Sequence, residues 1–578
     1  LDDLRAFRQW GSRTPGHPEN GVTDGVEVTT GPLGQGFANA VGMALSEAHL
    51  AARFNTDDHR VIDHFVYTLM GDGCVMEGVT AEAASLAGHL GLGKLIALYD
   101  DNRVTIDGPT DLAFSEDVTA RFAAYGWHVQ TVEDGDEDVD GVAAAIERAR
   151  AELDRPSLIR VRTTIGYGAP TKAGTADTHG APLGEEEIAG ARAALGWPHE
   201  PFVVPDAARD HLRAARDRGA AAEAAWNERL DAYRAAHPKR AAQLDRLLAR
   251  ELPDGWADAL PAFSPDDGPG ATRAHSGACL NALAGAVPLL GGSADLSPSN
   301  KTLLTESGDL QRGAYGQRNV RFGVREHAMG AICNGIALYG AGLKPYCATF
   351  LVFTDYMRAA IRVAALSGAD AIFVMSHDSV AVGEDGPTHQ PVEHLATLRA
   401  MPGLVVVRPA DGNETAGAYR AAVPDRERPY LLALSRQKVP QLPGTDAAKV
   451  ARGGYVLSGG GETPDLILIG TGAELGLCVD AAERLRGEGK RVRVVSMPST
   501  ELFAEQSAEY RESVLPAAVT RRVVVEAGTT FGWERYATGH GAVVGIDRFG
   551  ASAPGGTCLE KFGFTVDNVV ETALKLLG

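Results

Sequence analysis

Two polar clusters follow two apolar runs in the first part of the chain. Gly71-Asp72-Gly73 comes directly after the run 65–70, and Asp100-Asp101-Asn102 follows the run 95–99. If these runs are neighbouring parallel strands, their carboxyl ends meet at the edge where open α/β sheets bind ligands. A carboxylate, an amide oxygen and a backbone carbonyl are hard donors that suit Mg²⁺ together with phosphate oxygens. The spacing therefore predicts a site for a metal and a diphosphate, although Gly-Asp-Gly alone is also common turn chemistry.

The segment after Asp72 supports this prediction. Gly73 lets the backbone approach a ligand closely and offers its N–H group. The next segment is helix-like, and its amino terminus would point at the same edge, where it favours anions.

The elements that must position these residues alternate between helix-like and strand-like runs. In residues 1–195, "VGMALSEAHLAARFN" has helical periodicity, whereas "FVYTLM", "LIALYD" and "SLIRVRTT" are typical of buried strands. Similar blocks follow at about 270–440 and from about 450, and the third contains "GTGAE" between a strand and a helix. This alternation predicts three α/β domains with parallel or mainly parallel sheets. We assign the "GTGAE" turn to packing rather than catalysis, with a dimer contact left open.

Residues 205–250 are rich in Ala, Arg, Asp and Glu, which predicts exposed helices that bridge two domains. Residues 1–10 resemble the inside of a helix, and we expect that further residues precede Leu1. The predicted domains are 1–200 for the diphosphate and metal, 201–268 for the helical linker, 269–440, and 450–578.

Composition narrows the class of protein. The 578 residues carry a net charge of -20, which argues against a general nucleic-acid binder. Charges interrupt every apolar run well before membrane-spanning length, and no signal peptide is evident. The six cysteines show no Cys-x-x-Cys spacing, so we expect reduced thiols and a cytoplasmic location.

The motifs resemble one family over nearly the whole chain. "SRTPGHPE", "TTGPLGQG", "GDGCVMEG", "DDNRVTIDG", "GGSADLSPSN", "GVREHAMG" and "GEDGPTHQP" are similar to transketolase sequences and occur in the same order. The Gly-Asp-Gly to Asn spacing resembles the thiamine diphosphate fingerprint. The resemblance implies a diphosphate-binding domain, a pyrimidine-binding domain at 269–440 and a C-terminal α/β domain.

The resemblance also implies how the cofactor is held. Asp72, Asn102 and the Val104 carbonyl would bind Mg²⁺, for which Ca²⁺ or Mn²⁺ could substitute. Gly73 and His179 would contact the diphosphate. The cofactor's aminopyrimidine would lie along Gly31, Pro32 and Leu33, against an aromatic wall of Phe350, Phe353 and Tyr356. Aromatic residues three apart are also typical of a core-facing helix stripe.

Glu326 is the first catalytic candidate. Hydrogen bonding of a carboxylic acid to N1′ of the aminopyrimidine would stabilise the imino form that removes the C2 proton of the thiazolium. A glutamate at a largely apolar sheet edge would have a raised pKa, as this role requires. Taken alone, "REH" is a common charged start of a helix.

The substrate residues implied by the resemblance carry positive or polar groups. An arginine fork suits a phosphate geometrically. Asp385 would bind a substrate hydroxyl, and His17 and His389 would handle protons at the reacting carbon. The full implied set is His17, His179, Arg273, Ser299, His377, Asp385, His389 and Arg436.

The implied reaction is reversible transfer of a two-carbon ketol unit through a thiamine-bound dihydroxyethyl intermediate. The donor would be of the xylulose 5-phosphate type, and the acceptors of the ribose 5-phosphate or erythrose 4-phosphate type, as in the pentose phosphate pathway. A homodimer with active sites at the subunit interface would follow, without nucleic acid or membrane partners. Dihydroxyacetone synthase, deoxyxylulose-phosphate synthase and a non-catalytic subunit of the same fold are the alternatives.

Overall fold

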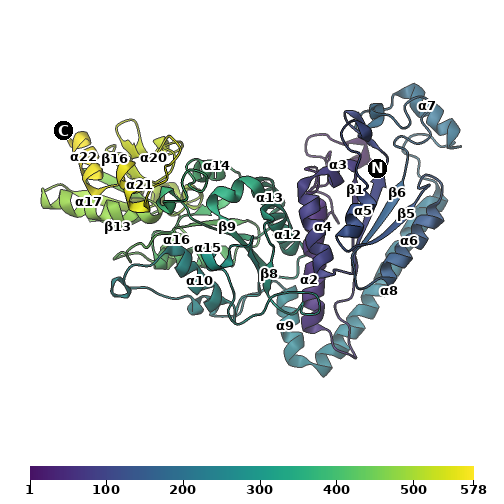
Figure 1. Ribbon diagram of the computed structural model, residues 1–578, viewed down its shortest axis with the longest axis horizontal. Coiled ribbons are helices and arrows are strands. Elements are labelled where there is room, and N and C mark those ends of the chain that lie inside the picture. Colours follow the sequence, from purple (N-terminus) through teal and green to yellow (C-terminus); the bar gives the residue numbers. More distant parts are fainter. Residues whose placement is uncertain (462) are drawn as a thin grey trace. The chain divides into compact units, whose positions relative to one another are not determined.

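The chain folds into two compact units (Figure 1). The computed structural model describes residues 1–461 and 463–578. Unit 1 comprises Leu1–Arg250, Leu310–Gln317 and Leu338–Ala341, and unit 2 comprises Glu251–Asp309, Arg318–Ala337 and Gly342–Gly578.

Unit 1 is built on a parallel four-stranded sheet in the order β1-β2-β6-β5. The strands are β1 (Val66–Gly71), β2 (Leu95–Asp101), β5 (His128–Val132) and β6 (Ser157–Arg162). The apolar residues of β2 and β6 are buried on both faces, which is typical of parallel sheets covered by helices. The strands predicted from "FVYTLM", "LIALYD" and "SLIRVRTT" are thus confirmed, but the first is not buried as expected, because Tyr67 and Leu69 of β1 are exposed.

Helices connect these strands and cover the sheet. They include α2 (Gln35–Phe54), α3 (Asp72–Met76), α4 (Gly78–Leu90), α5 (Val118–Ala124), α6 (Val139–Ala151) and α7 (Glu185–Ala194). The buried face of α2 is rich in alanine, so this helix packs closely against α4 (Figure 1). A small hairpin, β3 (Val104–Thr105) with β4 (Gly108–Pro109), follows β2.

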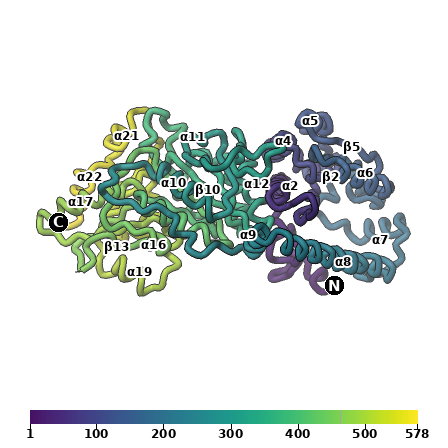
Figure 2. The backbone as a smooth tube through the Cα atoms, turned by 90° about the horizontal axis from the view of Figure 1, so that it is seen from below, coloured from purple at the N-terminus to yellow at the C-terminus, as the bar shows by residue number. Residues whose placement is uncertain are grey.

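The charged segment after residue 205 is helical, as predicted. It forms α8 (Asp206–Ala236) and α9 (Pro238–Leu248), whose course through unit 1 can be followed in Figure 2. Only Leu230 and Tyr233 of α8 are buried. Trp226 anchors α8 because its indole N–H donates to the Val61 carbonyl at 2.9 Å.

Unit 2 contains two sheets. The first is parallel throughout, in the order β11-β12-β10-β9-β7-β8. Its strands are β7 (Leu289–Ser293), β8 (Asn319–Arg321), β9 (Lys344–Phe350), β10 (Ile372–Ser376), β11 (Val405–Val407) and β12 (Tyr430–Leu434). Its helices include α10 (Thr272–Leu283), α11 (Ser297–Asn300), α12 (Glu326–Leu338), α13 (Thr354–Ser367), α14 (His394–Arg399) and α15 (Gly412–Ala422).

The second sheet of unit 2 is mostly parallel, in the order β13-β15-β14-β16-β17. Its strands are β13 (Tyr455–Ser458), β14 (Leu466–Gly470), β15 (Val492–Ser496), β16 (Arg522–Val525) and β17 (Ala542–Val544), and β13 alone is antiparallel to its neighbour. The helices α17 (Leu475–Gly487) and α22 (Val566–Leu577) pack against each other. Three mainly parallel α/β sheets therefore confirm the predicted fold class.

The amino-terminal helix is much shorter than predicted. Only α1 (Asp2–Arg5) forms, and the chain then turns at Arg8, which has a φ of +61°. The Arg8 N–H donates to the Thr14 carbonyl, so this loop closes on itself instead of continuing a helix.

Two further observations concern the described residues. All six cysteines are free thiols there, and five of them are buried. None of the described helices combines the length and apolar character needed to cross a membrane.

Candidate active site

The two strand tips predicted to meet do so in unit 1. β1 and β2 pair in parallel with Gly71 opposite Asp100, so Asp72 lies beside the end of β2. The backbone N–H of Arg103 donates to Asp72 Oδ2 at 2.9 Å, and the Tyr99 hydroxyl donates to Oδ1 at 2.6 Å. The carboxyl ends of adjacent strands therefore hold the Asp72 carboxylate in place from two sides.

Burial disfavours the ionised form of the Asp72 carboxyl group. Desolvation raises its pKa, and the nearby Asp101 and Asp100 carboxylates raise it further, against the lowering effect of the Tyr99 and Arg103 hydrogen bonds. A cavity of ≈ 390 Å³ beside it is also lined by Asp101 and Arg160. A buried carboxylate among like charges is an electrostatic setting that a divalent cation would relieve.

Asn102 and Val104 lie next to Asp72, but their groups are engaged locally. Asn102 Oδ1 accepts from the Val104 N–H at 3.0 Å, and its Nδ2 donates to Asp100 at 3.2 Å. The amide therefore forms a turn with its own loop, and its oxygen, which has two lone pairs, accepts one backbone N–H there.

The Gly31–Gly34 segment lies against the start of the helices after β1. A Cβ on Gly73 would come within 2.7 Å of the Leu33 side chain, and one on Gly31 within 3.2 Å of the His17 ring. Gly31 has a φ of +131°, a conformation that side chains rarely adopt. His17, Leu33 and Gly73 are thus brought together around a stretch of bare backbone.

His179 is exposed and follows a short helical turn, Ala176–Thr178. Among the contacts of the described residues, none joins it to Asp72. Its predicted role with the diphosphate stays a prediction.

In unit 2 the predicted residues gather at the carboxyl ends of the first sheet. Phe350 ends β9, and its ring is stacked 5.8 Å from that of Phe353, which is in turn stacked 5.8 Å from Tyr356. The His377 ring lies 3.7 Å from Phe350, and the His389 ring 5.4 Å from Phe353. The aromatic residues therefore form a ladder with two imidazoles beside it, rather than a stripe in the core.

Glu326 is the first residue of α12 and is buried, with 8 % of its surface exposed. It follows β8 at the same sheet. Glu326 therefore does begin a helix, and its role with the pyrimidine ring stays a prediction.

The candidate phosphate residues surround His377. Arg273 Nη1 donates to the Ser299 carbonyl at 2.9 Å and lies 3.4 Å from His377 Nε2. Arg436 follows β12 and is exposed. Its charge lowers the pKa of Arg273, after the larger effect of burial. Two guanidinium groups near one imidazole suit an anion.

Asp385 is exposed in the loop between Gly383 and Gly386, both of which have positive φ. No contact recorded for the described residues ties it to His377, so its role with a substrate hydroxyl stays a prediction.

Comparison with known proteins decides the family. Residues 1–253 match the model of the transketolase thiamine diphosphate binding domain, 269–441 the pyrimidine binding domain, and 453–565 the transketolase-like C-terminal domain. A transketolase of Nostoc sp. is 59% identical over 581 residues, covering 100% of this chain and 87% of the relative. The chain belongs to the transketolase family.

Solved transketolases agree in three dimensions. The enzyme of Leishmania mexicana superimposes with a TM-score of 0.96 at 49% identity, covering 100% of this chain and 85% of the other. A transketolase of Pichia stipitis in complex with sedoheptulose-7-phosphate gives 0.97 at 46% identity with the same coverage. The protein is thus an enzyme of the transferase class, as a transketolase is.

The residues of this transketolase fit thiamine diphosphate. Cβ atoms added at Gly73 and Gly31 would press on the Leu33 and His17 side chains, so only bare backbone fits beside these residues. Carboxylate, amide and carbonyl oxygens at the β1 and β2 tips are the donor set that Mg²⁺ prefers. The ladder at Phe350 supplies an apolar wall for a flat ring.

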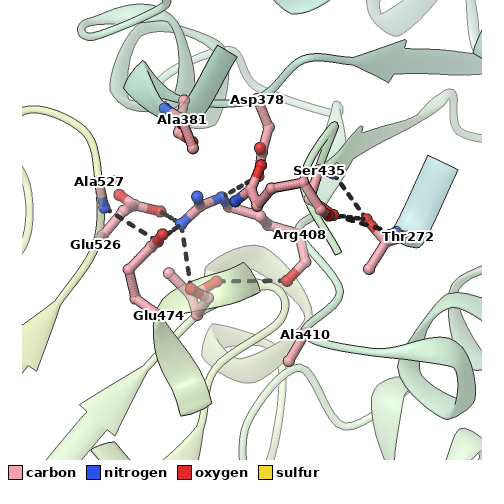
Figure 3. A network of polar contacts seen from close by, with 12 residues as sticks. Thr272, Asp378, Ala381, Arg408, Ala410, Ser435, Glu474, Glu526 and Ala527 are labelled. Atoms are coloured by element: carbon pink, nitrogen blue, oxygen red, sulfur yellow. Dashed lines mark hydrogen bonds and ion pairs between the residues drawn. The ribbon is translucent and has the colours of Figure 1, made fainter. Parts of the chain in front are cut away.

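The segment that carries His377 is strained and firmly held in this transketolase. His377 has a φ of +63°, which costs free energy for a residue other than glycine. Its neighbour Asp378 accepts from Arg408 Nε at 2.9 Å (Figure 3). Arg408 is fully buried directly after β11 and also donates to Glu474, which ends the short helical turn after β14.

Glu526 extends this buried network. Arg399 binds both of its carboxylate oxygens at 2.8 Å, and the Trp533 indole N–H donates to it at 2.6 Å. Burial raises the pKa of Glu526, but the charge and hydrogen bonds of Arg399 outweigh this and leave it lowered.

Sequence reasoning missed several buried polar groups near the site, among them Asn300 and Ser376, which hydrogen-bond to each other at 2.7 Å. Glu474 is the glutamate of the "GTGAE" turn that was assigned to packing, and Asn300 ends the quoted motif "GGSADLSPSN". No role was predicted for Tyr99, Ser376 or Arg408 either. A polar residue at or just after each buried strand was the signal that could have found Ser376 and Arg408.

Proposed function

We propose that the protein transfers a two-carbon ketol unit reversibly from a ketose phosphate to an aldose phosphate. The observation that carries this proposal is one sheet edge of unit 2, where an aromatic ladder, two imidazoles and Arg273 lie within contact of one another. Ring binding, proton handling and phosphate binding are the three tasks such a transfer needs.

Thiamine diphosphate, when bound, supplies a thiazolium that accepts the electron pair released as the carbon–carbon bond breaks. Asp72, Asn102 and the Val104 carbonyl would hold Mg²⁺ with the diphosphate, and the Gly73 N–H would donate to a phosphate oxygen. Ca²⁺ or Mn²⁺ would fit the same hard donors.

Around the pyrimidine ring, Glu326 would hold a proton at ring atom N1′, while Phe350, Phe353 and Tyr356 exclude water from the ring face. Its buried position at the start of α12 supports this role.

For the substrate, Arg273, Ser299, His377 and Arg436 would hold the phosphate. His389 and His17 would move protons at the carbonyl and hydroxyl oxygens of the reacting carbons, with His179 close by. Asp385 would bind a hydroxyl. The sedoheptulose-7-phosphate complex of the Pichia stipitis transketolase supports sugar phosphates as the substrate class.

Three parts of the proposal concern the molecule in the cell. We expect a homodimer whose active sites form at the subunit interface. We also expect the enzyme to act in the pentose phosphate pathway and to be located in the cytoplasm. Size measurement in solution and cell fractionation test the first and last of these.

An assay of reconstituted protein tests the function. Protein freed of ligands is titrated with thiamine diphosphate and Mg²⁺, and then supplied with xylulose 5-phosphate and ribose 5-phosphate. We expect cofactor binding and formation of a seven-carbon ketose phosphate. Cofactor binding without turnover would instead indicate a non-catalytic subunit, and formaldehyde as the preferred acceptor would indicate a dihydroxyacetone synthase.

A further inference from the structure

A chain of buried hydrogen bonds runs through unit 2 to His377. Ser293 ends β7, Asn300 ends α11, and Ser376 ends β10. The exposed fraction of each of these three side chains is 1% or less. We call these residues and His377 the Ser293–His377 relay.

The donor and the acceptor of each hydrogen bond in the relay can be assigned in only one way. The Ala348 carbonyl can only accept, so the Ser293 hydroxyl donates to it at 3.0 Å. Ser293 Oγ then accepts from Asn300 Nδ2 at 3.0 Å, which turns Asn300 Oδ1 toward Ser376. The Ser376 hydroxyl donates to that oxygen at 2.7 Å.

This direction decides which ring nitrogen of His377 carries the proton. Ser376 has one hydroxyl proton, and Asn300 takes it. His377 Nδ1 lies 2.8 Å from Ser376 Oγ and must therefore be the donor. In the neutral ring, Nε2 carries the lone pair and accepts from Arg273 Nη1 at 3.4 Å.

The surroundings keep the ring neutral. Burial lowers the pKa of His377 to about 3, with further lowering by the positive charges of Arg273 and Arg436 and by His389. Phe350 covers the ring at 3.7 Å and is uncharged. A phosphate dianion reaching this atom would thus meet two guanidinium donors and one lone pair.

We propose that the relay, with Asn300 as its positioning residue, makes binding of a phosphate ester take up one proton, held between His377 Nε2 and a phosphate oxygen. This rests on the phosphate site of the proposed function. The proton comes from solvent, and no covalent bond changes.

A pH dependence follows. A phosphate monoester is mainly a dianion above its second pKa of about 6. At pH values above the second pKa of the phosphate and below the pKa of the shared proton in the complex, the complex holds one proton more than its free partners, so affinity should fall about tenfold per pH unit. Two arginines binding the dianion alone would give an affinity nearly independent of pH in this range.

Calorimetry on the holoenzyme tests the proposal. Protein loaded with thiamine diphosphate and Mg²⁺ is titrated with ribose 5-phosphate at pH 8, without a ketose donor, in two buffers that differ in ionisation enthalpy. We expect uptake of about one proton per site. Ribose without phosphate serves as the reference ligand.

The outcomes separate the two claims. Equal affinity for ribose and ribose 5-phosphate would overturn the phosphate site itself. Tighter binding of ribose 5-phosphate with no proton uptake would support the phosphate site but contradict the relay proposal.

Variants test the relay through the same readout. Ser376→Ala removes the acceptor of Nδ1–H, and Asn300→Leu frees the Ser376 hydroxyl to donate to Nδ1. In both, the ring can carry its proton on Nε2 and donate directly, so proton uptake should fall toward zero and the pH dependence should flatten.

The matched control is Thr388→Ala, because the Thr388 hydroxyl lies 2.9 Å from Nδ1 of the other histidine, His389. It should keep an uptake of about one proton. If the buried variants fail to fold, the proton count and pH slope of the unaltered protein still decide, and unchanged uptake in folded Ser376→Ala would contradict the proposal.

Discussion

At the residue scale, the carboxyl of Glu326 is the group on which the proposed chemistry depends most. Glu326→Gln keeps the size of the buried side chain but removes its acidic proton. We expect turnover to fall by about 10²–10⁴-fold, the usual contribution of a positioned acid or base. Steady-state kinetics with xylulose 5-phosphate and ribose 5-phosphate measure this loss.

Binding of thiamine diphosphate should be little affected in this variant. The affinity for thiamine diphosphate, measured by calorimetry, should change much less than turnover, since the amide can still form a hydrogen bond. Glu560→Gln, at an exposed position of the same unit, is the matched control and should keep full activity. Full turnover in Glu326→Gln would remove this residue from the mechanism.

At the element scale, Arg408 ties the tip of β10 to the second sheet of unit 2. It binds Asp378 and Glu474, and all three side chains are at most 2 % exposed. Removing one partner of a buried ion pair leaves an uncompensated charge, which costs about 3–5 kcal/mol. We therefore expect Arg408→Met to lower the free energy of unfolding of unit 2 by about this amount, measured by urea denaturation.

A second readout connects this network to the site. Because Asp378 follows the strained His377, loosening it should raise KM for ribose 5-phosphate more than it lowers kcat. The control is Arg491→Met, whose ion pair with Asp465 is solvent-exposed and should matter little. Equal effects of the two variants would show that the buried network has no special role.

At the scale of the whole molecule, Asp72 belongs to unit 1 and Glu326 to unit 2. We propose that each site takes these residues from different subunits. Co-expression of Asp72→Asn with Glu326→Gln should then recover about a quarter of normal activity, because half of randomly paired dimers carry one intact site of two.

Each variant expressed alone provides the baseline for this experiment. If each site were built within one subunit, both sites of a mixed dimer would carry a substitution, and an equal mixture would show only the mean of the two residual activities. A size measurement before the assay confirms that mixed dimers have formed.

Much of the site could be predicted where residue type and local spacing carry the information. Gly-Asp-Gly after one strand and Asn102 after the next predicted the meeting of Asp72 with the β2 tip, because consecutive parallel strands share one edge. The family resemblance implied an aromatic wall from Phe350 to Tyr356, whereas the spacing alone was typical of a core-facing helix stripe.

Other features depend on residues that are distant along the chain. Asn300 and Ser376 are 76 positions apart, and Arg408 and Glu474 are 66 apart. The residues next to each of these four in the sequence do not indicate which distant residue it will contact. Sequence reasoning therefore assigned the Glu474 turn to packing and passed over Asn300.

The sequence by itself determined the order of the elements, the family resemblance and the kinds of groups available for chemistry, because these follow from residue type and short-range spacing. Only the tertiary structure decided which way the hydrogen bonds of the Ser293–His377 relay run and how far burial displaces the pKa of His377 and Asp72. Both depend on which groups surround an atom in space and on how much water they exclude, and neither quantity is local in the chain.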